Sequence, residues 1–174
     1  DRNCTVQVRY IETSEGVVTK GYSCEPNEVR EHPYDDYSNE TLAELAYSDA
    51  EAAKLLGVRM SGNHEEALRL FARAAALENG SPEPIQYYSA LSAGPVAQNG
   101  EPVAETLYTQ LVLQTVAERL GKQPGMAEFW KSEIRSGLPN PDRVIDDAQA
   151  EAEDILAYMR DVKLTVTGHT TIAD

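Results

Sequence analysis

The chain has 174 residues, of which 41% are hydrophobic and 25% are charged. This size and composition predict one globular domain with at most a small appendage, and they exclude a chain that is disordered throughout. The formal net charge of -14 argues against nucleic acid and anionic membrane surfaces as partners, because both bind through clustered Lys and Arg.

No apolar run approaches the roughly 20 residues that a membrane-spanning helix needs, so we expect no membrane insertion. The chain begins at Asp1 without an initiator Met. We interpret it as a processed or trimmed chain whose leader has been removed.

The N-terminal segment, residues 1–25, predicts a β-hairpin closed by a disulfide. β-branched and aromatic residues fill two runs, Val6–Ile11 and Val17–Tyr22, on either side of a turn-like Thr-Ser-Glu-Gly sequence. A hairpin would bring its ends together and place Cys4 opposite Cys24, which favours a disulfide over two reduced, buried thiols. Such a bridge predicts a periplasmic or secreted protein of the bacterial envelope.

Residues 26–38 are polar, contain two prolines and show no hydrophobic period, which is typical of a linker loop. His32 lies there beside Pro33 and near two aspartates. A divalent cation would need about three or four converging ligands, so a solvated loop is the favoured interpretation.

From residue 39 to residue 163 the apolar residues recur at helical spacing, which predicts a helical domain. Capping and stop signals place helices at Glu40–Tyr47, Asp49–Met60, His64–Leu77, Glu83–Ser92, Val103–Leu120, Met126–Ser136 and Pro141–Val162. Ser48 and Glu51 are interpreted as a capping box. Residues 93–102 are expected to form a loop, and the β-prone residues from Leu164 a frayed tail or an added strand.

Two of the predicted helices carry a spaced pattern of small and large residues. Leu56 and Gly57 lie in the first helix, Ala67 and Phe71 in the second, and Pro82 follows them. This order resembles the L-G-x-x-Y, A-x-x-x-F and Pro pattern of tetratricopeptide repeats. The sequence FARAA, which begins at Phe71, resembles the W-Y-x-K-A-A signature of the related Sel-one-like repeats.

The resemblance covers about residues 50–82 and implies a short α-solenoid of antiparallel helix pairs behind the small hairpin. Residues 83–120 and 126–162 would form two further pairs without the signature. The alternative is an irregular helical bundle that uses Leu-Gly and Ala-rich contacts. In either case the small residues have a packing role.

Within the pair, Leu56 belongs to the buried side, and Gly57 would let the partner helix approach closely. Ala67 and Ala74 would line that contact, and Phe71 would fill the gap between neighbouring pairs. These residues are therefore expected to serve packing rather than chemistry.

The first helix of each tetratricopeptide-like pair lines a concave face that binds peptides or partner proteins. The positions that resemble this face are Glu51, Lys54 and Val58, which share one side of a helix, with Tyr87 as a weaker candidate. An exposed helix surface is the alternative interpretation. The resemblance implies a non-enzymatic module that binds a protein or peptide, as a monomer or a small oligomer.

Motifs for catalysis, metals and cofactors are missing from the sequence. His64 and Glu65 begin like a zinc-protease helix, but Leu68 stands where the second His is required. Nucleophile-elbow, phosphate-binding and dinucleotide-binding glycine patterns are absent as well. We therefore expect no catalytic residue, no metal site and no cofactor.

Carboxylates leave two further hypotheses open. Asp147, Glu151 and Asp154 crowd one face of the last predicted helix, which is typical of a solvated surface but would also suit a cation or a basic partner. A Glu/Asp pair in a helical cleft would make the protein a hydrolase of a cell-envelope polymer. A large exposed apolar patch would instead indicate a structural assembly subunit.

Overall fold

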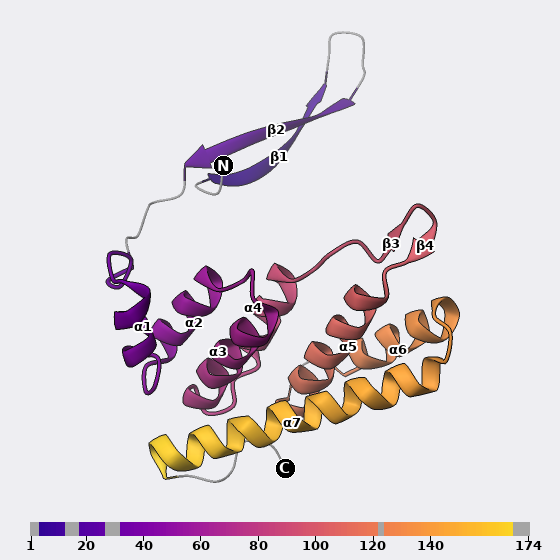
Figure 1. Cartoon of the computed structure of the whole chain (residues 1–174). Coiled ribbons are helices and arrows are strands. Elements are labelled where there is room, and N and C mark those ends of the chain that lie inside the picture. The colour runs from indigo at the N-terminus through magenta and orange to yellow at the C-terminus, as the bar shows by residue number, and fades with distance from the viewer. Residues whose placement is uncertain (1–3, 13–17, 27–31, 122–123, 169–174) are drawn as a thin grey trace. The chain divides into compact units, whose positions relative to one another are not determined.

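The computed structural model describes residues 4–12, 18–26, 32–121 and 124–168, with side chains from residue 32 onward. The chain divides into two compact units, Asp1–Asp36 and Tyr37–Asp174. The described part is mostly helical and contains a small antiparallel sheet near the N-terminus (Figure 1), which confirms the predicted fold class at this coarse level.

The first unit contains a hairpin of β1 (Cys4–Glu12) and β2 (Val18–Pro26), as predicted. Its register pairs Cys24 with Val6 and Cys4 with Pro26, so the two cysteines are not directly opposite each other. Diagonal positions in such a ladder lie roughly 7–8 Å apart, and a disulfide usually joins Cα atoms about 4.4–6.8 Å apart. The bridge stays a prediction, because both cysteine side chains fall outside the described side chains, and the expected turn lies outside the described residues.

The helical unit begins with α1 (Asn39–Leu45), α2 (Ala50–Arg59) and α3 (His64–Leu77). Ser38, Asp49 and Asn63 are their N-caps, and each side chain accepts hydrogen bonds from backbone N–H groups of the first turn. The prediction of a capping box at Ser48 was wrong by one residue. The Asp49 carboxylate caps α2 instead, at 2.9 Å from the N–H of Glu51.

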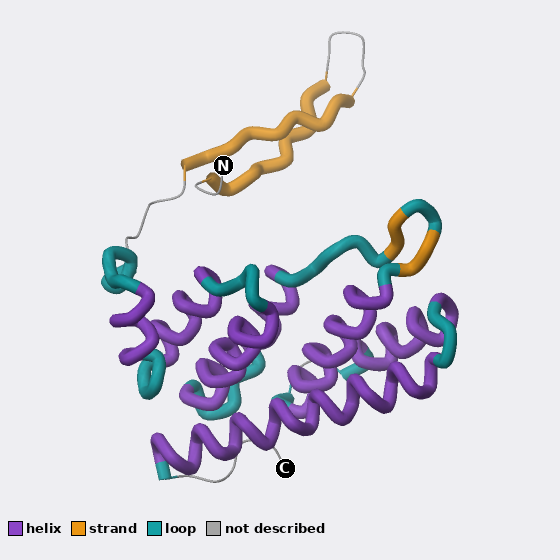
Figure 2. The backbone as a smooth tube through the Cα atoms, in the orientation of Figure 1, coloured by secondary structure: helices purple, strands orange, loops and turns teal. Residues whose placement is uncertain are grey.

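The next helices are α4 (Glu83–Leu91) and α5 (Ala104–Arg119), which pack against each other. The predicted loop between them contains two short paired strands, β3 (Ala97–Gln98) and β4 (Glu101–Pro102), drawn in orange in Figure 2. Asn99 and Gly100 form their turn with φ of 53° and 80°. Two consecutive positive φ angles are the requirement of a type I′ hairpin turn, and the Asn-Gly sequence was its signal.

The last helices are α6 (Met126–Gly137) and α7 (Pro141–Thr167). The expectation of a frayed tail or an added strand was wrong for residues 164–167, because α7 continues to Thr167. Residues 169–174 of the predicted tail lie outside the described residues. The hydroxyls of Thr165 and Thr167 donate to backbone carbonyls one turn earlier, at 2.9 and 2.7 Å. Val166 packs against the core, and Gly168, with φ of 74°, ends the helix.

The residues predicted to pack the α2–α3 pair are buried, and the structure gives a contact between the two helices at Gly57 and Phe71. Ala67, Ala74 and Phe71 are fully buried, and Leu56 is nearly so. A Cβ atom added to Gly57 would lie 2.9 Å from the Phe71 ring, so the absent side chain is what allows the ring to lie there. The same ring stacks on Tyr88 of α4, with centroids 5.0 Å apart.

The long helix α7 contacts α3, α5 and α6 (Figure 1). In a stack where each helix pair touches only its neighbours, the second helix of the first pair would not meet the last helix. The contact between α3 and α7 is therefore the feature that distinguishes this unit from a simple stack. No described helix is both long enough and apolar enough to cross a bilayer.

Candidate functional site

The residues predicted to line a binding groove are already engaged with their neighbours. The Lys54 ammonium lies 2.7 Å from a carboxylate oxygen of Glu51 and 2.7 Å from one of Glu78. Partial burial lowers the pKa of Lys54, but the hydrogen bonds and charges of these two carboxylates outweigh it and raise the pKa above its ordinary value. Its charge is therefore balanced within the α2–α3 pair.

The other two groove candidates differ from each other. Val58 packs against the hydrophobic core rather than standing open to solvent. Tyr87 is 48% exposed, and its ring centroid lies 5.9 Å from that of Phe71. A binding role for Glu51, Lys54, Val58 and Tyr87 stays a prediction.

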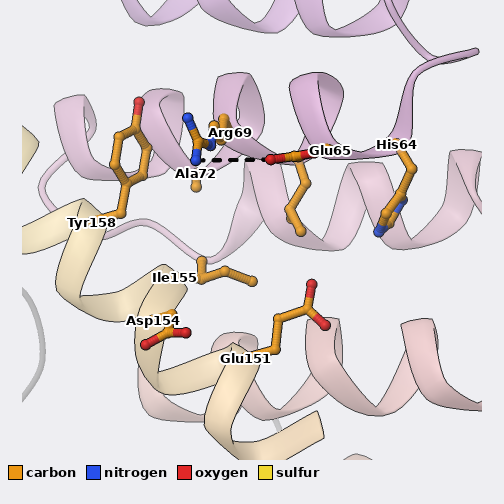
Figure 3. A pocket seen from close by; sticks show the side chains of 9 residues that line it. His64, Glu65, Arg69, Ala72, Glu151, Asp154, Ile155 and Tyr158 are labelled. Carbon is orange, nitrogen blue, oxygen red and sulfur yellow. Dashed lines mark ion pairs between the residues drawn. The ribbon is translucent and has the colours of Figure 1, made fainter. Parts of the chain in front are cut away.

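A cavity of about 430 Å³ lies between α3 and α7 (Figure 3). We name it the acidic cavity. Both helices supply its lining, which consists of His64, Glu65, Leu68, Arg69, Ala72, Glu151, Asp154, Ile155 and Tyr158.

The acidic cavity has an apolar floor and a polar rim. Leu68, Ala72 and Ile155 are buried, with exposed fractions of 5%, 1% and 9%. Leu68 and Ala72 are one turn apart on α3, so they present a continuous apolar strip to α7. Glu151 and Ile155 have the same spacing on α7. The Glu151 carboxylate therefore lies next to the apolar floor, on the wall that α7 supplies.

The rim carries more negative than positive charge. Glu65, Glu151 and Asp154 supply three carboxylates, whereas Arg69 supplies the one guanidinium of the lining. Arg69 pairs with Glu65 at 3.9 Å, with side chains that are 69% and 85% exposed. This loose surface pair is drawn as the dashed line in Figure 3. Glu151 is half-buried and points into the space between the helices (Figure 3).

Residues behind the cavity hold its walls in place. Burial raises the pKa of the Tyr108 hydroxyl on α5, and a hydrogen bond and charge from Glu151 raise it further. The hydroxyl of Tyr158 lies 3.5 Å from Arg73 Nη1. Arg73 Nε also donates to the carbonyl of Tyr47, at 3.0 Å, so the same guanidinium ties α3 to the turn after α1 and to α7.

A second cavity, of about 300 Å³, lies on the other side of His64. We name it the hydroxyl-lined cavity. Its lining comes from the α2–α3 turn, α4 and the start of α5, and consists of Ser61, Gly62, His64, Tyr88, Ser92, Glu105, Thr106 and Thr109. Glu105 is the one acidic residue of this lining, which contains neither Lys nor Arg.

His64 lines both cavities, and a hydrogen bond fixes its ring. Its Nδ1 atom lies 2.5 Å from the Tyr88 hydroxyl, and the two rings stack with centroids 5.6 Å apart. Burial raises the pKa of Tyr88, so the phenol stays protonated over the ordinary pH range. The contact occupies Nδ1 and leaves Nε2 as the second hydrogen-bonding atom of the ring.

Sequence reasoning found only part of this site. It identified the acidic face of the last helix, and the structure places Glu151 and Asp154 of that face on the acidic cavity. Asp147 is exposed and does not line the cavity. His64 and Glu65 were considered only as an incomplete zinc motif. The contact between α3 and α7 joins segments that are far apart in the chain, and no local sequence pattern predicts it.

Within the described residues, no group of three or more His, Cys, Asp or Glu side chains is arranged to hold a metal ion. Comparison with protein-family models, with curated proteins and with solved structures finds no match.

Proposed function

We propose that the helical unit is a non-enzymatic binding module that recognises a basic segment of a partner protein in the acidic cavity. The observation that supports this most directly is the combination of a buried apolar floor with a rim rich in carboxylates. The α2–α3 pair would be the tetratricopeptide-like element. The cavity would then use the second helix of that pair rather than the first.

An Arg or Lys side chain has the chemistry that this cavity complements. Its methylene stem can pack on Leu68, Ala72 and Ile155 while its cationic head remains in contact with water and carboxylates. Glu151 and Asp154 stand one turn apart on α7, where their mutual repulsion is relieved by a cation between them. The Tyr158 ring at the rim offers a face for a guanidinium group.

The net charge of the chain favours the same partner. With a formal charge of -14, the protein attracts cationic segments and repels anionic ones before contact is made. Such steering raises association rates and depends on ionic strength. The charge alone would not select a site, and the cavity supplies the place where a cation is held.

Open carboxylates favour binding over polymer hydrolysis. A glycosidase general acid is typically a carboxyl group whose surroundings keep it protonated near neutral pH. Glu65 is 85% exposed and Asp154 is also exposed, and the half-buried Glu151 already accepts a hydrogen bond from Tyr108, which favours its charged form. The rim is thus better suited to hold a charge than to deliver a proton.

The test is a titration of the chain into the labelled pentapeptide Ser-Gly-Arg-Gly-Ser, acetylated and amidated, followed by fluorescence anisotropy. The double variant E151Q/D154N removes two charges from the cavity wall, and we expect it to weaken binding by about tenfold. The matched control is D146N/D161N, which removes two charges from exposed positions of the same helix outside the cavity.

The control should weaken binding by less than about twofold. Equal loss in both double variants would show that only the overall charge matters, and it would overturn the proposal. Absence of binding by the unmodified chain at low ionic strength would overturn it as well.

A further inference from the structure

We infer that the recognised segment is extended, with its basic side chain in the acidic cavity and its neighbouring main chain running past His64 into the hydroxyl-lined cavity. The inference rests on the proposed function. In addition to the cationic side chain, the protein would bind the peptide groups next to that side chain. A free cation would therefore occupy only the acidic cavity.

The shared wall is the first step of the argument. His64 lines both cavities, so the two meet at this residue, and a segment that occupies both must pass it. The bond between Nδ1 and Tyr88 holds the ring at the junction. The Tyr88 hydroxyl also lies 3.4 Å from the His64 carbonyl, to which it can donate its proton. If it donates to Nδ1 instead, Nε2 of a neutral ring is a donor to a peptide carbonyl; if it donates to the carbonyl and accepts from Nδ1, Nε2 is an acceptor for a peptide N–H. In both arrangements Nε2 can bond one group of a peptide unit.

The chemistry of the hydroxyl-lined cavity is the second step. Ser61, Ser92, Thr106 and Thr109 present hydroxyl groups, each able to donate and to accept. A peptide unit offers one N–H donor and one C=O acceptor, and both need partners when they leave water. A surface of hydroxyls therefore suits main chain better than it suits a second charge.

The charges around the hydroxyl-lined cavity also favour a neutral main chain over a second cation. Glu105 contributes one negative charge, but it stands in the first turn of α5, where the positive end of the helix dipole opposes it. The N-terminus of α3 lies at the same cavity through His64. The positive ends of the two helices reduce the attraction of Glu105 for a cation.

Bonds within the protein orient part of this surface. The Ser92 hydroxyl donates to the Tyr88 carbonyl at 2.8 Å, so its lone pairs remain available as acceptors. Thr106 and Thr109 are three residues apart on α5, on the same side of the helix. Together they can bond consecutive groups of an extended segment.

The experiment compares two neutral-capped probes that share one Arg, by nuclear magnetic resonance titration of the isotope-labelled chain. One probe is acetyl-Arg-amide, and the other is acetyl-Ser-Gly-Arg-Gly-Ser-amide. We expect the pentapeptide to bind about tenfold more tightly, because two or three additional hydrogen bonds form. Signals of Thr106 and Thr109 should shift only with the longer probe.

The variant T106V/T109V tests the source of this gain, because valine keeps the shape of threonine and removes the hydroxyl. We expect it to bind both probes with similar affinity. The control T115V removes a hydroxyl from the same helix outside the cavity, where Thr115 bonds the Leu111 carbonyl at 2.7 Å. It should keep the full preference for the pentapeptide.

The outcomes separate this inference from the proposed function. Equal affinity of the unmodified chain for both probes, or a gain that survives in T106V/T109V, would overturn the inference and leave the acidic cavity as a site for a lone cationic side chain. Binding of neither probe would overturn both proposals. Loss of the gain in T106V/T109V but not in T115V would support the extended segment.

Discussion

Gly57 of α2 lies where the Phe71 ring of α3 leaves no room for a side chain. Ala in a helix is favoured over Gly by about 1 kcal/mol, so G57A would stabilise α2 in isolation. In the folded unit its Cβ would lie 2.9 Å from the ring, and stacking on Tyr88 restricts movement of the ring. Overpacking of this kind costs about 1–3 kcal/mol, so we expect a net loss of stability.

Urea denaturation measures this loss as a lower midpoint of unfolding. The matched control is G62A, because a Cβ at Gly62 would meet no atom within 4 Å. That variant should keep the midpoint or raise it slightly. A stabilised G57A variant would contradict the packing role of Gly57.

The role of Gly57 was open to sequence reasoning because the interaction is local. Gly57 and Phe71 lie on adjacent helices joined by a tight turn, and the pattern of small and large residues predicts a close approach at Gly57 with Phe71 in the gap between helix pairs. The identity of the Phe71 stacking partner, Tyr88 of α4, and the bond from Tyr88 to His64 were not predicted. Both depend on how α4 packs against the pair, which residue types alone do not specify.

At the scale of the helix, α6 begins without a capping side chain of its own. Its N-cap is Gly125, and a carboxylate oxygen of Glu118, near the end of α5, accepts from the N–H groups of Gly125 and Ala127 at 2.8 and 3.1 Å. A negative charge there also opposes the positive end of the helix. Glu118 thus joins the end of one helix to the start of the next.

We expect E118A to destabilise the unit by about 1 kcal/mol, the usual effect of removing a capping acceptor. Hydrogen exchange of the α6 amides should accelerate more than that of α2. E118Q keeps an acceptor oxygen and should recover much of the loss. The control E133A alters an exposed carboxylate of α6 and should have little effect. Equal exchange in E118A and E133A would contradict the capping role.

Most helix positions could be predicted, because capping residues, apolar spacing and glycine stops act within a few residues. The exceptions had tertiary or side-chain causes. α7 continues through the β-prone residues after Leu164 because Val166 packs on the core, and the helix gives the hydroxyls of Thr165 and Thr167 carbonyl acceptors one turn earlier. The β3–β4 hairpin, in contrast, was readable from Asn99 and Gly100 and was overlooked.

At the scale of the molecule, the acidic cavity exists because α7 packs across α3. One wall comes from α3 and includes Glu65, and the other comes from α7 and includes Glu151. These two helices are far apart in the sequence. The acidic face of α7 was visible in the sequence, but its partner surface was not. Two amphipathic helices that are distant in the sequence pack together when the shapes of their apolar faces are complementary. The spacing of residues within one helix therefore cannot show which other helix it contacts.

The same contact predicts how the helical unit unfolds. Leu156 is fully buried on α7, which packs against α3, α5 and α6, so L156A should cost about 2–5 kcal/mol. Hydrogen exchange should show equal losses of protection in α3 and α5, whereas a neighbour-only stack would leave the α2–α3 pair protected. L164A is the control, because Leu164 on the same helix is 50% exposed and should matter little. Unchanged protection of the α3 amides in L156A would show that α7 unfolds independently of α3. The wall that α7 supplies to the acidic cavity could then be lost while the α2–α3 pair stays folded.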